Sequence, residues 1–310
     1  MSSQSDPVYI FLAFWVFIEY LAVVVINVLA SLPDDPTGWF KNQTGDISDK
    51  YYVDINPAGW AFSIWSVIYV WQALWIIYAI VNIFRSNKFG KVYLNPPTVS
   101  PVFLVTYSLN LVFNITWLFL WDRQYLPIAT PCLALITFTL YLCLWFNHRA
   151  VAKYIDQLRD HSKVDLWLNR ILIQNGLTTY ATWCTIATLL NFTSTLVYFA
   201  DVEQKTACIL SLSILTVELL LFVILDNFVW DKYLRSTFMA YPVVIWASTA
   251  SLVNNWNPEN PVSIFNAVVV GLAGAAFVFK NIMLVVRACR EEDACASKTD
   301  GNKVPLQDVA

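Results

Sequence analysis

The chain has 310 residues, of which 58% are hydrophobic and only 13% are charged, and its formal net charge is −3. Average globular domains carry about 25% charged residues, so this composition excludes an ordinary soluble protein and indicates a multi-pass membrane protein. A negative net charge without a basic cluster argues against nucleic-acid binding.

Eight apolar stretches are predicted to cross the membrane as helices, because each has about the 20 residues that span a hydrocarbon core of about 30 Å. They lie near residues 8–31, 59–84, 101–121, 124–147, 171–191, 206–229, 236–254 and 263–287. These stretches lack the alternation of a membrane β-barrel, so the predicted fold class is an all-α integral membrane protein. The polar stretch 290–310 is predicted to be a disordered cytoplasmic tail.

The positive charges indicate an orientation. With eight spans both termini share one side, and of 19 Lys and Arg residues all but five fall in loops or tails of that side. The exceptions are Lys41, Lys50, Arg123 and Lys205 on the opposite side and Lys280 within the last span. The positive-inside rule therefore predicts cytoplasmic termini. The sequon Asn42-Gln43-Thr44 lies in the predicted outer loop 32–58, and glycosylation of Asn42 would favour the plasma membrane or endomembranes over mitochondria.

Polar and aromatic side chains form helical stripes in the second, third and fifth spans. The stripes are Trp65, Tyr69 and Gln72; then Tyr107, Asn110, Asn114, Trp117 and Trp121; then Tyr180, Trp183, Cys184, Ala187 and Asn191. Trp and Tyr usually gather at the membrane interfaces, whereas Trp65, Trp117 and Trp183 lie inside their spans. Amides at this depth are expected either to bond between helices or to line a cavity for an apolar ligand. Three such stripes in three helices favour the cavity.

Three motifs resemble one family. Tyr180-x-x-Trp183-x-x-x-Ala187-Thr188-x-Leu190-Asn191-Phe192 resembles the fifth helix of the TspO/translocator-protein family, the tryptophan-rich sensory proteins. Leu111-x-x-Asn114-x-x-Trp117 with Arg123-Gln124 is similar to its third helix. Pro57-x-x-Trp60-x-Phe62-x-x-Trp65-x-x-x-Tyr69 is similar to its second.

The resemblance covers residues 1–200 and implies a five-helix bundle with a cavity for tetrapyrroles, sterols or similar ligands. By position it implies that six residues line or brace this cavity: Trp65, Asn114, Trp117, Tyr180, Trp183 and Asn191. Tyr69 and Asn110 join them as stripe residues. Residues 201–289 are expected to form three additional helices. No cofactor is implied with the fold.

Ionisable residues also occur at depth. Glu19 and Glu218 lie at the midpoints of the first and sixth spans, where a charged residue costs about 2.5–3.5 kcal/mol. They are expected to face the interior, either for proton coupling or ligand recognition, or as protonated carboxyls that bond between helices. Lys280 in the last span is expected to snorkel to the interface, with an ion pair to Glu218 as the alternative.

The sequence thus predicts a membrane protein that binds a porphyrin-like or sterol-like molecule and carries or senses it. The alternatives are a proton-coupled solute carrier that uses Glu19 and Glu218, or a scaffold that binds no ligand. An enzyme is not expected, because no catalytic motif and no metal-ligand spacing is found. The expected partners are the lipid bilayer and the ligand, and a homo-oligomer is left open.

Overall fold

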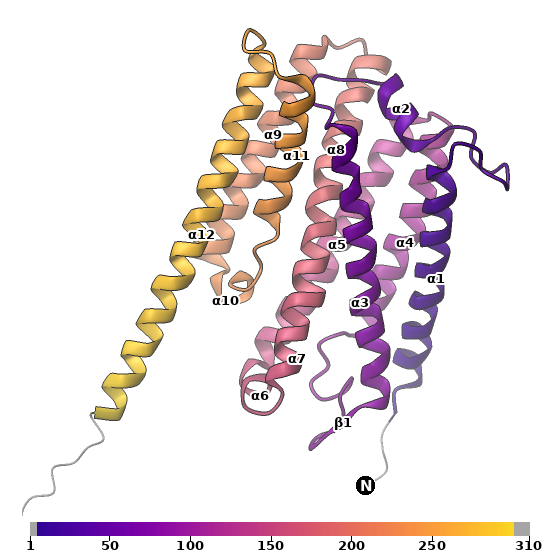
Figure 1. Ribbon diagram of the computed structural model, residues 1–310. Coiled ribbons are helices and arrows are strands. Elements are labelled where there is room, and N and C mark those ends of the chain that lie inside the picture. The colour runs from indigo at the N-terminus through magenta and orange to yellow at the C-terminus, as the bar shows by residue number, and fades with distance from the viewer. Residues whose placement is uncertain (1–4, 301–310) are drawn as a thin grey trace, which may run out of the picture.

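The computed structural model describes residues 5–300 and consists of long helices that run alternately up and down one bundle (Figure 1). The long helices are α1 (Pro7–Ser31), α3 (Ile64–Phe84), α4 (Pro101–Asp122), α5 (Leu126–Lys153), α8 (Gly176–Phe199), α9 (Gln204–Ile224), α11 (Ala240–Asn255) and α12 (Pro261–Asp300). The short helices are α2 (Thr44–Lys50), α6 (Ile155–His161), α7 (Lys163–Leu168) and α10 (Asp231–Leu234). A 3₁₀ turn, η1 (Gly59–Ser63), precedes α3, and π-helical segments η2 (Asn169–Asn175) and η3 (Leu225–Val229) lie before α8 and after α9. Strands β1 (Ser86–Asn87) and β2 (Gly90–Lys91) form a small antiparallel hairpin.

Local capping explains where two of the helices begin. Oδ1 of Asp6 accepts from the N–H groups of Val8 and Tyr9 at 3.0 and 3.2 Å, and Pro7 begins α1. Ser100 and Pro101 start α4 in the same way. These side chains satisfy N–H groups that have no partner within the helix, and proline fits the first helical position because it has no N–H to satisfy.

Five helices form a closed ring. Around it α1 contacts α3, α3 contacts α8, α8 contacts α5, α5 contacts α4, and α4 returns to α1. Helices α9, α11 and α12 pack on one another beside this ring, and both α9 and α11 contact α8. The ring corresponds to the five-helix bundle expected from the sequence, and the three further helices extend it on the α8 side (Figure 1).

The membrane-crossing character of the helices is clear for most of the predicted spans. Within the described residues, six segments are long and apolar enough to cross a membrane: α1, η1 with α3, α4, α5, α9 with η3, and α12 as far as Arg287. The other two predicted spans correspond to α8 and α11, which are not among these six segments. Helix α8 carries buried polar residues such as Thr178, Thr179 and Asn191, and α11 has only 16 residues.

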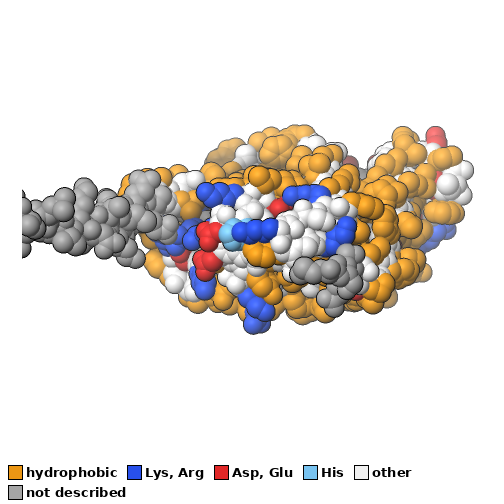
Figure 2. Space-filling model, turned by 90° about the horizontal axis from the view of Figure 1, so that it is seen from below, with side chains coloured by type: hydrophobic (Ala, Val, Ile, Leu, Met, Phe, Trp, Pro, Cys, Tyr) orange, Lys and Arg blue, Asp and Glu red, His pale blue; other side chains and the backbone are white. Residues whose placement is uncertain are grey.

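One end of the bundle is rich in positive charge. Seen from below, Lys and Arg side chains gather over the end of the bundle, and hydrophobic side chains surround them (Figure 2). The N-terminus and the end of α12 both lie toward this end (Figure 1). Helix α12 continues to Asp300, past residue 290 where the sequence predicted a tail, and residues 301–310 lie outside the described part of the chain.

Lys280 does not snorkel. Both Lys280 and Asp226 are 0% exposed, and the lysine Nζ donates to Asp226 Oδ1 rather than to Glu218. Asp226 lies in the π-helical segment η3, and its Oδ2 accepts from the hydroxyl of Tyr241 at 2.8 Å. The ammonium stays in the interior because a carboxylate on the neighbouring helix satisfies it there, which the sequence analysis did not foresee.

Candidate functional site

A cavity of about 610 Å³ lies inside the helix ring, between α1, α3, α4 and α8. Residues from α2 and from the segment around Pro57 also line it, at the end of the bundle opposite the Lys/Arg-rich face. Its aromatic lining consists of Tyr51, Phe62, Trp65, Tyr69, Trp117, Trp121 and Trp183. The volume is within the range of about 300–1,000 Å³ that is typical of small-molecule sites.

The structure brings most of the predicted residues to this cavity. Five of the eight line it directly: Trp65, Tyr69, Trp117, Trp183 and Asn191. They come from α3, α4 and α8, and their spacing of three to four residues places them on the inward face of each helix. The stripe in the middle of α8 therefore faces a cavity.

The aromatic side chains pack edge to face around Trp183. Its ring centroid lies 6.3 Å from that of Trp65 and 5.9 Å from that of Phe62, with interplanar angles of 87° and 90°. On α4, Trp117 and Trp121 are stacked with centroids 5.8 Å apart. Such pairs favour a fixed arrangement of the rings, so the cavity wall is preformed.

Two buried hydrogen-bond donors in the wall, Nε1 of Trp183 and the hydroxyl of Tyr69, have no acceptor among the described residues. The Tyr69 oxygen interacts with the Asn114 side chain, but this amide does not accept the tyrosine proton. Leaving a buried donor unsatisfied costs about 1–3 kcal/mol, so each such group needs an explanation. A ligand atom that accepts a hydrogen bond would satisfy them.

Asn114 and Tyr180 brace the cavity rather than line it. Nδ2 of Asn114 donates to the Tyr180 hydroxyl at 3.0 Å, and its Oδ1 accepts from Nδ2 of Asn27 at 3.0 Å. Asn27 lies on α1 and lines the cavity, although the sequence analysis did not single it out. On the opposite wall Asn191 Oδ1 accepts from Trp117 Nε1 at 3.5 Å. These bonds tie α1, α4 and α8 together behind the aromatic rings.

Asn110 does not reach the cavity. It is 0% exposed, and its Nδ2 donates to the Ile136 carbonyl at 2.8 Å and to Thr139 Oγ1 at 2.9 Å. Asn110 therefore links α4 to α5, as expected for an amide that bonds between helices.

Residues 32–58, which we call the lid, cover the cavity, and sequence reasoning missed this role. Trp121 Nε1 donates to the Thr44 carbonyl at 3.2 Å, and Ser194 Oγ donates to the Tyr51 carbonyl at 3.1 Å. Gln124 Oε1 accepts from Lys50 Nζ at 2.5 Å and from the Tyr51 hydroxyl at 3.0 Å. The lid is thus fastened to α4 and α8 and to the turn that follows α4.

The proposed glycosylation residue Asn42 belongs to the lid and is half-buried. Its Nδ2, the atom to which a glycan would attach, donates to the Asp122 carbonyl at 3.2 Å. Its backbone N–H donates to Asp122 Oδ1 at 2.9 Å. A glycan on Asn42 would need the side-chain bond to break.

Glu19 and Glu218 lie far apart. Glu19 is on α1, and its Oε2 is buried without a partner among the described residues. Glu218 is on α9, which belongs to the group of helices on the other side of the ring (Figure 1). The structure does not bring the two carboxyls into one site. In the part of the chain that was searched, no group of three His, Cys, Asp or Glu residues could hold a metal ion.

A family model described as TSPO-like protein matches residues 13–279. No curated protein and no solved structure matches the chain. The matched region includes the helix ring and also α9, α11 and the first part of α12, which the sequence analysis placed outside the resemblance.

Proposed function

The chain belongs to the TSPO-like protein family and is a multi-pass membrane protein, and from this premise we propose that its cavity binds an apolar or amphipathic small molecule and that the protein carries or senses it. One observation supports this proposal above all: an aromatic cavity of about 610 Å³ whose wall holds the unpaired donors of Trp183 and Tyr69.

The lining indicates the chemistry of the ligand. Flat rings can stack or pack edge to face against Trp65, Trp117 and Trp183, so a broad aromatic or polycyclic body fits the wall. The unpaired donors call for acceptor oxygens on the ligand. A tetrapyrrole with carboxylate side groups has both features, whereas a sterol offers a single hydroxyl. Tetrapyrroles are therefore the first class to test and sterols the second.

Tryptophan-fluorescence quenching of the purified full chain tests the proposal, with protoporphyrin IX and cholesterol as probes. Trp183→Phe keeps an aromatic ring but removes the N–H group. Loss of one hydrogen bond of about 0.5–1.5 kcal/mol should weaken binding about 2- to 10-fold. Trp15→Phe is the matched control, because Trp15 is an exposed side chain of α1 that does not line the cavity.

A second variant tests the bracing. Asn114→Ala removes the bonds to Asn27 and Tyr180 without touching the cavity surface, so it should also weaken binding while the protein remains folded. Flat titrations with both probes would contradict the proposal. Saturable binding of equal strength in wild type and all three variants would place the ligand elsewhere.

A further inference from the structure

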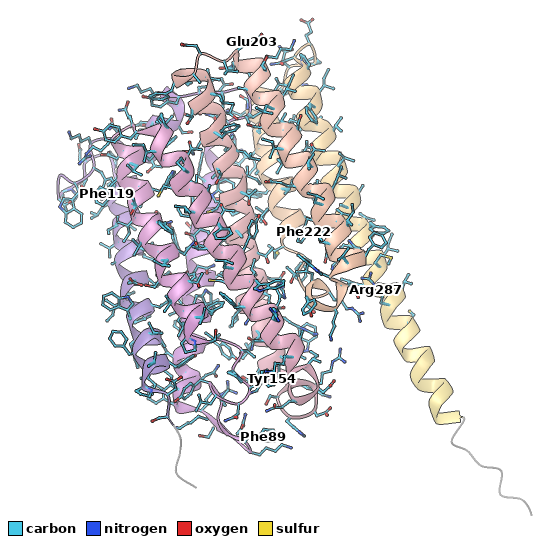
Figure 3. The ribbon with its side chains drawn as sticks, turned by 180° about the vertical axis from the view of Figure 1, so that it is seen from behind. Phe89, Phe119, Tyr154, Glu203, Phe222 and Arg287 are labelled. Atoms are coloured by element: carbon cyan, nitrogen blue, oxygen red, sulfur yellow. The ribbon has the colours of Figure 1, made fainter. Side chains whose placement is uncertain are left out.

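A second cavity lies outside the helix ring. It is a groove of about 430 Å³ between α5 and α8 of the ring and α9 to α11 beside it, near Phe222 in Figure 3. Its wall is mainly apolar, with Leu144, Leu215, Leu219, Phe222 and Val244 among its residues. It shares no lining residue with the cavity inside the ring. The residues from Tyr141 to Arg149 extend it about 12 Å along α5, at about 1.5 Å per residue.

A smaller cavity of about 230 Å³ adjoins the groove at the Lys/Arg-rich end of the bundle. His148 and Tyr233 line both, so the two spaces meet there. The smaller cavity is lined by four basic residues from three different segments: Arg159, Arg170, Lys232 and Arg235. Apolar and basic surfaces thus follow one another along a single path.

The basic cavity has unbalanced positive charge. The charges of Arg159 and Arg235 act on the half-buried guanidinium of Arg170. Arg235 bonds to Asp231 at 2.8 Å. Among the described residues, no carboxylate lies within salt-bridge distance of Arg159, Arg170 or Lys232. An anion is therefore the expected occupant.

His148 adds an independent observation at the junction. Its side chain is 6% exposed and interacts with the backbone of Tyr233, the other residue that lines both spaces. Its Nε2 lies 3.4 Å from the Thr237 hydroxyl. A buried imidazole therefore lies where the apolar groove meets the basic cavity.

We propose that the groove and the basic cavity together form a binding site for an anionic phospholipid, with an acyl chain in the groove and the phosphate among Arg159, Arg170 and Lys232. Basic pockets between membrane helices recognise lipid phosphates in this way. The continuous apolar groove selects a lipid over a free phosphate, because a soluble anion would leave the groove empty. Glu218 lines the groove seven residues before Leu225, about 10 Å along the helix, and so lies away from the phosphate.

Native mass spectrometry of the purified full chain tests this site. The probes are phosphatidylserine, phosphatidylcholine with the same acyl chains, and soluble glycerol phosphate. The test variant is Arg159→Gln with Lys232→Gln, both exposed side chains whose replacement leaves the core intact. The matched control is Lys153→Gln with Lys163→Gln, which removes the same charge from the same end of the bundle but outside the cavity. The expected result is at least a 5-fold loss of bound phosphatidylserine in the test variant and less than a 2-fold loss in the control.

A second variant examines the groove. Thr182→Phe places a ring in the groove and should reduce the binding of phosphatidylserine without changing the basic cavity. Equal losses in the test and control pairs would overturn the proposal, since general charge attraction would then explain binding. The proposal would also be overturned if phosphatidylcholine bound as strongly as phosphatidylserine. It would likewise be overturned if glycerol phosphate bound to the wild type while Thr182→Phe bound phosphatidylserine as strongly as the wild type does. None of these results depends on whether the cavity inside the ring binds its own ligand.

Discussion

Gly176 shows how a single absent side chain sets the distance between two helices. A Cβ at this position would lie 2.7 Å from Cδ1 of Trp71, which is closer than two non-bonded carbon atoms approach each other. The close approach lets Trp71 Nε1 donate to the Ile171 carbonyl at 2.9 Å, and Gln72 Nε2 donate to the Gly176 carbonyl at 3.2 Å. Helix α3 is thereby fixed to the junction of η2 and α8, about two turns before Trp183, the first cavity residue of α8.

Gly176→Ala should lower the free energy of unfolding by about 1–3 kcal/mol, because the added methyl group forces the bulky Trp71 ring away from its bond. Thermal unfolding in detergent measures the change. Gly274→Ala in α12 is the matched control, since a Cβ there meets nothing within 4 Å. Replacing a helical glycine by alanine in open space should keep or raise stability by about 0.5–1 kcal/mol. Equal shifts in the two variants would show that packing at Gly176 is not the cause.

Among the elements, the contact between η3 and α12 depends on a buried ion pair. Lys280 lies on α12 and Asp226 in η3, both fully buried. Lys280→Met leaves the carboxylate of Asp226 without its cation and should destabilise the protein by about 3–5 kcal/mol. Asp226→Leu with Lys280→Met removes both charges and should recover much of that loss, although the Tyr241 hydroxyl then lacks its acceptor.

Thermal unfolding of the two single variants and the double variant forms a double-mutant cycle that measures this coupling. A double variant as unstable as the sum of the singles would mean that the pair contributes no interaction of its own. The control is Arg287→Gln, which removes a partly exposed cation that pairs with Asp231 at 2.5 Å, and it should have a smaller effect.

The lid depends on its bonds to Gln124. Gln124 has a φ of 60°, a left-handed conformation that asparagine also tolerates, so Gln124→Asn keeps the turn but shortens the side chain. The bonds to Lys50 and Tyr51 should be lost, and α2 should open more often. Hydrogen exchange of the amides of residues 44–51 should accelerate about 2- to 10-fold, for a loss of about 0.5–1.5 kcal/mol. Gln157→Asn in α6, away from the lid, should leave this exchange unchanged, and equal rates in both variants would show that other bonds hold the lid.

Spacing within a helix could be read from the sequence, and contacts between helices could not. Residues three or four apart share a face in any helix, so Trp65, Trp117 and Trp183 were expected to face inward together, and all three line the cavity. Asn110 and Asn114 share one stripe, yet α5 approaches Asn110 closely enough to bond it, whereas Asn114 bonds to α1 and α8. The partner of Lys280 was missed for the same reason, because only the three-dimensional packing places Asp226 beside it.

Across the whole molecule, the C-terminal helices support the cavity as well as extend the ring. The Ala58 N–H donates to the Ala250 carbonyl at 3.1 Å, and Asn255 Nδ2 donates to the Asn56 carbonyl at 2.7 Å. Trp246 Nε1 donates to the Ala61 carbonyl at 3.1 Å. The first two bonds hold the end of the lid, and the third holds η1, which leads into α3. The family match through residue 279 is consistent with this integration. The division at residue 200 stays a prediction about domains, whereas the packing joins the two parts.

The remaining prediction concerns the orientation in the membrane, which was inferred from the distribution of Lys and Arg along the sequence alone. The Lys/Arg-rich end of the bundle should face the cytoplasm and the lid should face away from it. In a Cys289→Ser, Cys295→Ser background, Lys163→Cys at the basic end should react with an impermeant maleimide once the plasma membrane is permeabilised with digitonin. Asp34→Cys in the lid should react either in intact cells, if the protein is at the surface, or only after all membranes are dissolved. Both positions are exposed, and neither side chain has a hydrogen bond or ion pair among the described residues.

The two positions discriminate because they lie at opposite ends of the bundle. Labelling of Lys163→Cys before permeabilisation, with protection of Asp34→Cys, would reverse the orientation and direct the cavity toward the cytoplasm. A ligand entering past the lid would then come from the cytoplasmic side, and the basic cavity would meet the leaflet that is poorer in anionic lipid. Labelling of both positions under one condition would mean that an odd number of helices fails to cross the membrane. Helix α11, which has only 16 residues, would be the first to examine. Orientation therefore decides which aqueous compartment and which lipid leaflet each of the two sites can use.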